Sequence, residues 1–216
     1  MAGCTKAPGE ILVEVPDKAF RESLVAQGVD KNGDGRISQE EAKATRSLLV
    51  PPSGITDLTG LEAFIHLDSF TITLNPLTGI DISALVSLSY LECTSCELAE
   101  LDLSQNHSLE TLICGRNSLE ELDLSGNPSL IQLVCNNNLL TDLDLSDNTG
   151  LSTMISCGNQ LTSLDISRHT ALTKIGYDNM PMLTEVCVWT LPFPPAGVVV
   201  LMEYSPNVVH TTRCHE

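Results

Sequence analysis

The sequence is poor in aromatic and basic residues and has no long hydrophobic run. Aromatic residues make up 4% of the 216 residues, and 11 lysines and arginines face 28 acidic residues, which gives a formal net charge of −17. Because such a chain repels phosphate backbones and anionic headgroups, we expect no nucleic-acid or charge-driven membrane binding. No stretch approaches the roughly 18 apolar residues of a membrane span. The composition favours a protein partner with a neutral or basic surface.

The sequence repeats itself at a short, fixed period over its central part. The aspartates at positions 81, 102, 123, 144 and 165 are spaced by 21, and so are the leucines at 88, 109, 130, 151 and 172. Self-similarity at a short fixed period is typical of solenoids. We therefore predict six repeats over residues 56–181, preceded by an N-terminal cap over 1–55 and followed by a C-terminal cap over 182–216.

The rows carry the pattern L-x-x-L-x-(L or C)-x-x-N-x-L, as in Leu130, Leu133, Cys135, Asn138 and Leu140, although Cys96 and Met180 replace the asparagine in two rows. On this motif the chain resembles leucine-rich-repeat proteins. The resemblance implies an α/β solenoid with a curved parallel β-sheet and one strand per repeat. The VCVW and GVVV runs, which lie on either side of a proline turn, predict two short strands and so a small β cap at the C-terminal end. Alternation at the strand period of two predicts two core columns. They are residues 91, 112, 133, 154 and 175, and residues 93, 114, 135, 156 and 177.

Polar residues also recur in register. The asparagines at 75, 117, 138 and 159 fall where the chain leaves each strand, where a side-chain amide can bond the backbone of the turn. The aspartates from 102 to 165, with serines two residues later, open the return segment and can accept from backbone N–H groups. The alternative for the aspartate column is cation binding by stacked carboxylates.

Residues 30–41 match the loop D-x-[DN]-x-[DN]-G-x5-E at every position. A hard cation such as Ca²⁺ takes six to eight oxygen ligands from such a loop. The predicted ligands are Asp30, Asn32, Asp34, the carbonyl of Arg36, Ser38 through water, and Glu41. The alternative is that Ser38 and Glu41 form only a helix capping box and that the aspartates form only a solvated turn.

The flanks of the loop predict a helix, a loop and a second helix. The first helix starts at Pro16-Asp17 and carries Phe20, Leu24 and Val25 on one side. There is no second loop, so we expect a structural calcium site instead of the paired opening of a calcium sensor. We expect this unit to cover the first repeat, joined to it by residues 48, 49, 55, 58 and 61.

The calcium loop followed by rows of LTxLDLSxN and LxCxxN resembles a group of bacterial surface or exported leucine-rich-repeat proteins. The resemblance implies adhesion or protein recognition without a catalytic centre, and a location outside the cytoplasm. No P-loop, G-x-S-x-G, H-E-x-x-H or dinucleotide motif is present, and the five histidines are scattered. We therefore predict that the protein is not an enzyme.

The cysteines allow several interpretations. Cys93 and Cys96 form a C-x-x-C pair, but no second pair or histidine cluster follows, which favours buried small side chains over a redox or zinc site. Cys187 and Cys214 either form a disulfide that closes a loop over the last repeat, or remain free thiols. Cys4, after Ala2-Gly3, resembles the end of a lipoprotein cleavage box. Cys4 is either a lipidation site or an incidental cysteine. No signal peptide is visible in the chain as written.

The outward residues of the predicted strands suggest where a partner binds. We name eight of them the strand face: Tyr90, Glu92, Thr111, Ile113, Gln132, Val134, Thr153 and Ile155. Ile113, Val134 and Ile155 form an apolar stripe with a polar rim, which is typical of protein-binding patches on a concave sheet. The alternative is that these residues reflect only the β propensity of strands. A carbohydrate-binding module and a structural spacer of a surface assembly remain alternative functions.

Overall fold

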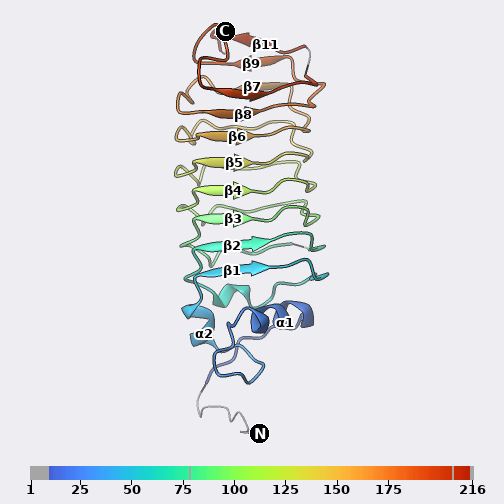
Figure 1. Ribbon diagram of the computed structural model, residues 1–216, viewed down its shortest axis with the longest axis vertical. Coiled ribbons are helices and arrows are strands. Elements are labelled where there is room, and N and C mark those ends of the chain that lie inside the picture. Colours follow the sequence, from blue (N-terminus) through green and yellow to red (C-terminus); the bar gives the residue numbers. More distant parts are fainter. Residues whose placement is uncertain (1–9, 78, 206, 215–216) are drawn as a thin grey trace.

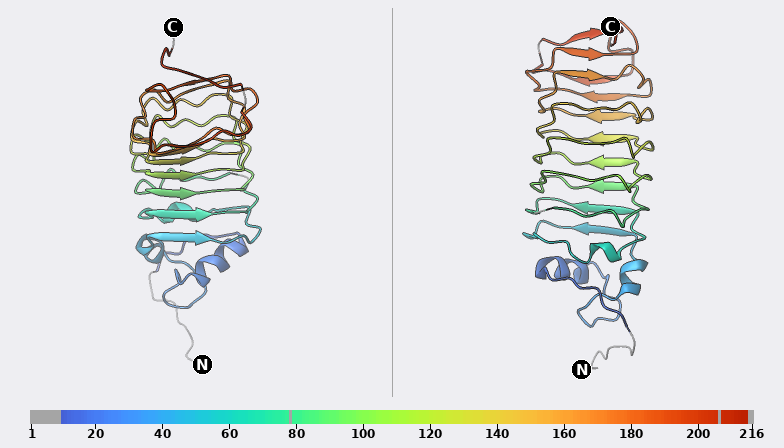
Figure 2. Two further views of the ribbon diagram at one scale, coloured as in Figure 1. Left: turned by 45° about the horizontal axis from the view of Figure 1, so that its top comes forward. Right: turned by 180° about the vertical axis from the view of Figure 1, so that it is seen from behind.

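The chain forms a solenoid of coils stacked along one axis, with helices at the N-terminal end (Figure 1). The computed structural model describes residues 10–77, 79–205 and 207–214. The helices are α1 (Lys18–Ala26) and α2 (Gln39–Ala44), and a short 3-10 helix, η1 (Leu61–Ala63), lies in the first coil. Figure 2 shows the same stack from two further sides. No helix among the described residues has the length and apolar character to cross a membrane.

The strands of one side of the coils form a large parallel sheet with the order β1-β2-β3-β4-β5-β6-β8-β10. Its strands are β1 (Ser47–Val50), β2 (Ser69–Ile72), β3 (Tyr90–Glu92), β4 (Thr111–Ile113), β5 (Gln132–Val134), β6 (Thr153–Ile155), β8 (Lys174–Gly176) and β10 (Val199–Leu201). A small parallel sheet joins β7 (Ser163–Asp165), β9 (Glu185–Cys187) and β11 (Val209–Thr211) in the order β11-β9-β7. The predicted leucine-rich-repeat solenoid is confirmed.

The interior is filled by the two predicted columns. All five residues of the first column, from Leu91 to Ile175, are fully buried, and so are the five of the second, from Cys93 to Tyr177. Strand pairing places each residue beside its equivalent in the next repeat, as with Leu112 beside Leu133. Each coil therefore buries its apolar side chains only against neighbouring coils, which explains why the repeats must stack to be stable.

The turn asparagines act as predicted. Asn138 accepts the N–H of Leu119 at 3.1 Å, and its amide donates to the carbonyls of Cys114 and Cys135 at 3.1 and 3.0 Å. Asn159 makes the equivalent bonds one coil later. These bonds satisfy backbone groups that the turn would otherwise leave buried and unpaired.

The large sheet extends beyond the six predicted repeats at both ends. β1 lies within the segment assigned to the N-terminal cap, and Ser47 pairs with Ser69. β10 lies within the segment assigned to the C-terminal cap, and Lys174 pairs with Val199. The boundaries at 55 and 181 therefore do not coincide with the edges of the sheet. Both end coils are longer than the central ones, so their strands do not follow the 21-residue spacing from which the repeats were predicted.

The N-terminal helices cover one end of the stack (Figure 1). Asp17 caps α1 by accepting the N–H of Phe20 at 2.9 Å, and both Phe20 and Leu24 are fully buried, whereas Val25 is 36% exposed. Four residues of the expected join are buried, namely those at 48, 55, 58 and 61. Leu49 is 59% exposed, so its assignment to the join is wrong. It alternates with Leu48 on β1 and therefore points outward.

Candidate functional site

The strand face lies on four neighbouring strands of the large sheet, from β3 to β6. Register places Ile113 beside Val134 and Val134 beside Ile155. All eight strand-face residues are half-buried, because each packs against its equivalent on the next strand. The stripe that the sequence predicts is therefore contiguous, but its side chains are less exposed than isolated surface residues.

Beyond Ile155 the column of the stripe continues towards an apolar residue. Beyond Ile155, a Cβ on Gly176 would lie 2.9 Å from the Cδ1 atom of Ile155, so the isoleucine side chain leans over this glycine. Register then places Leu201 beside Gly176, and Leu201 is 42% exposed. At the other end the column is polar, because Glu92 lies beside Ile113 and Thr71 lies beside Glu92. Leu49 follows next to Thr71. Sequence reasoning missed Leu49 and Leu201 as outward residues because their coils depart from the spacing of the central repeats.

The strand face carries little charge. Glu92 is its one carboxylate, and it accepts the hydroxyl of Tyr90 at 3.0 Å. Burial and the neighbouring Glu92 raise the pKa of Tyr90 above its ordinary value, so this phenol stays neutral. The stripe is thus flanked by neutral hydrogen-bonding groups and, beside Ile113, by the carboxylate of Glu92, which suits a partner surface that is apolar at its centre.

The acidic excess lies on the return segments. Each aspartate of the column accepts the N–H of the serine two residues later, at 3.0 Å for Asp81 and 2.8 Å for Asp102. The hydrogen bonds from Ser83 hold the pKa of Asp81 below its ordinary value. An open hollow of about 730 Å³ beside this column is lined by Glu100, Glu120 and Glu121 among others. The predicted turn role of the aspartates is confirmed, and the four carboxylates from Asp81 to Asp144 are exposed outside the strand face.

The loop at residues 30–41 is closed from end to end. The Oε1 atom of Glu41 accepts the N–H of Lys31 at 2.7 Å, which joins the last loop position to the second. Asp30 accepts the N–H groups of Gly33 and Gly35 at 2.7 and 2.8 Å. Gly35 has a φ of +78°, a conformation that glycine adopts without strain. The predicted bend therefore lies where the loop pattern places it.

The residue types of this loop match the ligands that a hard divalent cation takes, although the carboxylates of Asp30, Asp34 and Glu41 do not all lie within 4.8 Å of one another. Three carboxylates, an amide, a hydroxyl and a carbonyl lie on one tight loop, and oxygen ligands of this kind suit Ca²⁺. Burial would raise the pKa of Glu41, but hydrogen bonds from Ser38, Lys31 and Asn32 outweigh it and lower that pKa. The capping box of the alternative interpretation is also present, since Glu41 accepts from the backbone of Ser38 at 2.9 Å. The capping box and the closed loop therefore coexist.

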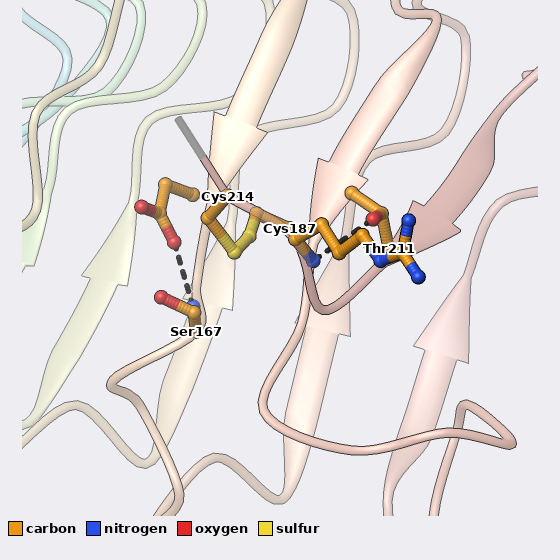
Figure 3. Close-up of a disulfide and its surroundings, with 6 residues drawn as sticks. Ser167, Cys187, Thr211 and Cys214 are labelled. Atoms are coloured by element: carbon orange, nitrogen blue, oxygen red, sulfur yellow. Dashed lines mark hydrogen bonds between the residues drawn. A yellow bond between two sulfur atoms is a disulfide. The ribbon is translucent and has the colours of Figure 1, made fainter. Parts of the chain in front are cut away.

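A disulfide bond joins Cys187 and Cys214 (Figure 3). Their Cα atoms are 5.7 Å apart, and the bond connects β9 to the segment after β11. Asp165 lies next to both sulfur atoms and accepts the N–H of Ser167 at 2.8 Å. Because the two sulfurs are bonded to each other, this cluster does not offer thiolates to a metal ion.

The remaining cysteines and histidines have structural surroundings. Burial raises the pKa of the Cys93, Cys114 and Cys135 thiols, so none of these is a thiolate near neutral pH. His169 is buried, and its Nε2 atom lies 3.1 Å from the carbonyl oxygen of Leu145. His210 lies 2.7 Å from the hydroxyl of Tyr177. Cys4, the predicted lipidation site, lies outside the described residues.

The architecture and the sites described above define a leucine-rich-repeat solenoid with a helical N-terminal cap. No protein family and no curated protein matches the sequence. Among solved structures, the chain is similar to an internalin C2 from Listeria monocytogenes, with a TM-score of 0.68 and 15% identity over 96% of this chain and 100% of that one. This similarity shows the fold.

Two other solved structures match less closely in shape. The functional domain of InlJ from Listeria monocytogenes, which includes a cysteine ladder, gives a TM-score of 0.41 at 24% identity over 88% of this chain. The chain spans 60% of the length of that domain. A structure of CBM51-2 in complex with GlcNAc and INT domains from Clostridium perfringens ZmpB gives 0.36 at 26% identity, over 42% of this chain and 19% of that one.

Proposed function

We propose that this chain is a non-enzymatic recognition or adhesion module of a bacterium, which binds a protein through its strand face. The observation that carries this proposal is the contiguous stripe of Ile113, Val134 and Ile155, held in register and bordered by polar side chains. A regular sheet of this kind presents many side chains at fixed spacing, so a partner can be bound without reorganisation of the module.

Two further features support the proposal. The module works outside the cytoplasm, where the Cys187–Cys214 disulfide is stable. It carries one structural calcium ion, for which the closed loop at residues 30–41 supplies the oxygen ligands. When bound, the ion neutralises the carboxylates of Asp30, Asp34 and Glu41 and stabilises the cap that covers the first coil.

The test compares two triple variants in cross-linking and co-purification from native cells. The first variant changes Ile113, Val134 and Ile155 to aspartate. The matched control changes three exposed apolar residues outside the strand face, Val86, Ile131 and Leu139, to aspartate. Both variants must melt at a temperature similar to that of the wild type before the comparison is made.

We expect one protein to co-purify with the wild type and the control and to be lost from the strand-face variant. Capture by all three chains would contradict the proposal and favour a structural spacer. Retention on a polysaccharide column that the strand-face variant loses would favour a carbohydrate-binding module. The geometry gives that alternative less support, because Tyr90 is the one aromatic residue of the strand face and its hydroxyl bonds Glu92.

A further inference from the structure

The segment before α1 pairs with the end of the calcium loop. The N–H of Val13 donates to the carbonyl of Ile37 at 2.8 Å, and the N–H of Gln39 donates to the carbonyl of Ile11 at 2.8 Å. Leu12 and Ser38 form an antiparallel bridge between these two bonds. Residues 37–39 lie between two predicted ligands, the Arg36 carbonyl and Glu41, and include a third, Ser38. The pairing therefore fixes the backbone that connects them.

The same segment reaches the first half of the loop. The carboxylate oxygens of Glu10 lie 3.4 and 3.5 Å from the Nδ2 atom of Asn32. Asn32 is the second predicted ligand of the loop, so Glu10 places one more negative charge beside the cation position. Residues 10–12 thus contact the loop on both sides of its bend.

The segment then continues onto the solenoid. A Cβ on Gly60 would lie 2.6 Å from the carbonyl oxygen of Glu14 and 2.9 Å from a side-chain carbon of Val15. Gly60 directly precedes η1 in the first coil and has a φ of +103°, so both its conformation and the close approach require glycine. Val15 is buried, and its carbonyl accepts from the side chain of Arg21 at 2.8 Å.

We propose that residues 10–15, which we name the strap, complete the single calcium loop and couple it to the first coil. The strap takes the place of a second loop: its backbone orders residues 37–39, and Glu10 increases the negative charge at the site. Because ordering is achieved before the ion arrives, less conformational entropy is lost on binding. Calcium binding in turn stabilises the strap and so holds the cap on the solenoid. This inference rests on the proposed calcium site.

The first test is calcium titration by calorimetry on two proline variants of the full chain. Val13→Pro removes the N–H that donates to Ile37. Ile11→Pro is the matched control, because the Ile11 N–H donates no hydrogen bond among the described residues and its side chain is 65% exposed. We expect Val13→Pro to weaken calcium binding about tenfold or more and Ile11→Pro to change it about twofold or less.

The second test replaces a charge and leaves the backbone intact, so it remains decisive if Val13→Pro fails to fold. Glu10→Gln should weaken calcium binding several-fold at low salt, whereas Glu14→Gln, an exposed charge in the same strap, should not. In the wild type, calcium should also slow hydrogen exchange at the amides of Val13 and Gln39.

The outcomes separate the two proposals. If the wild type binds no calcium, both the calcium site and the strap are overturned. If calcium binds the wild type and all four variants with equal affinity, the strap is overturned while the calcium site stands. A loss of affinity in Val13→Pro and Glu10→Gln alone supports the strap.

Discussion

His169 occupies the position that asparagine holds in the three preceding coils. Asn106, Asn127 and Asn148 recur at the period of the repeats, and each donates from its buried amide to carbonyls of the previous coil, as Asn148 does to Leu124 at 3.1 Å. His169 makes one such contact, with Leu145, and its Nδ1 atom has no partner within the described part of the chain. Burial lowers the pKa of His169, although the Leu145 carbonyl and Asp165 partly offset it.

His169→Asn should therefore protect the protein against acid. Below pH 6.5 the unfolded chain binds a proton at this histidine while the folded chain stays neutral, so the free energy of unfolding of the wild type falls as the pH falls. The loss is at most about 1.4 kcal/mol per pH unit over that range. Urea unfolding should show that the free energy of unfolding of His169→Asn exceeds that of the wild type by more at pH 5 than at pH 7.5. An equal pH dependence in His169→Asn and in the exposed control His107→Asn would contradict this account.

Glu41→Gln should remove the effect of calcium on stability. Glutamine still serves in a capping box, so α2 keeps its N-terminal bonds, but the carboxylate that closes the site is lost. At about 100 times its Kd, calcium should stabilise the wild type by about 2.7 kcal/mol, which corresponds to an expected Tm increase of about 5 to 10 °C. Calorimetry with calcium and with a chelator should show this difference for the wild type alone. Equal calcium responses in the two chains would refute the site.

At the scale of the structural element, the turn asparagines connect one coil to the next. Asn138→Ala should lower the free energy of unfolding by about 3 kcal/mol, because the Leu119 N–H and the Cys114 and Cys135 carbonyls lose a buried partner. Asn136→Ala, at a half-buried position two residues earlier, should change it by about 0.5 kcal/mol or less. Denaturant titration measures both. Equal losses would show that the amide of Asn138 has no special role.

The central elements could be predicted from the sequence, and the end elements could not. Where the coils keep a constant length of 21 residues, aligning the repeats with one another predicts the strands, both core columns and the stripe. The end coils are longer, so the alignment places β1 and β10 in the caps and Leu49 in the interior. The strap could not be predicted, because it pairs through backbone groups of residues such as Val13 and Ile37, which no side-chain pattern connects. The column of Asn106, Asn127, Asn148 and His169 recurs every 21 residues, so it could have been predicted from the sequence.

At the scale of the whole molecule, most acidic residues of the repeats lie outside the strand face that we propose for recognition. Residues 56–181 contain 17 acidic and three basic residues, yet Glu92 is the one carboxylate of the strand face. If the proposal holds, the field of the acidic return segments favours the approach of a basic or neutral partner, and the stripe sets where that partner binds. Salt should separate the effect of charge from the effect of the stripe. Higher ionic strength should lower the association rate constant more than it raises the dissociation rate constant.

The most direct measurement of the central claim is site-specific photo-cross-linking in native cells. A photoreactive residue at Gln132 lies within the strand face, and one at Gln105 lies on an exposed return segment of the preceding coil. Recognition through the strand face predicts a discrete protein adduct from position 132 that is absent from position 105. Identical adducts from the two positions, or no adduct from position 132, would contradict recognition through this face.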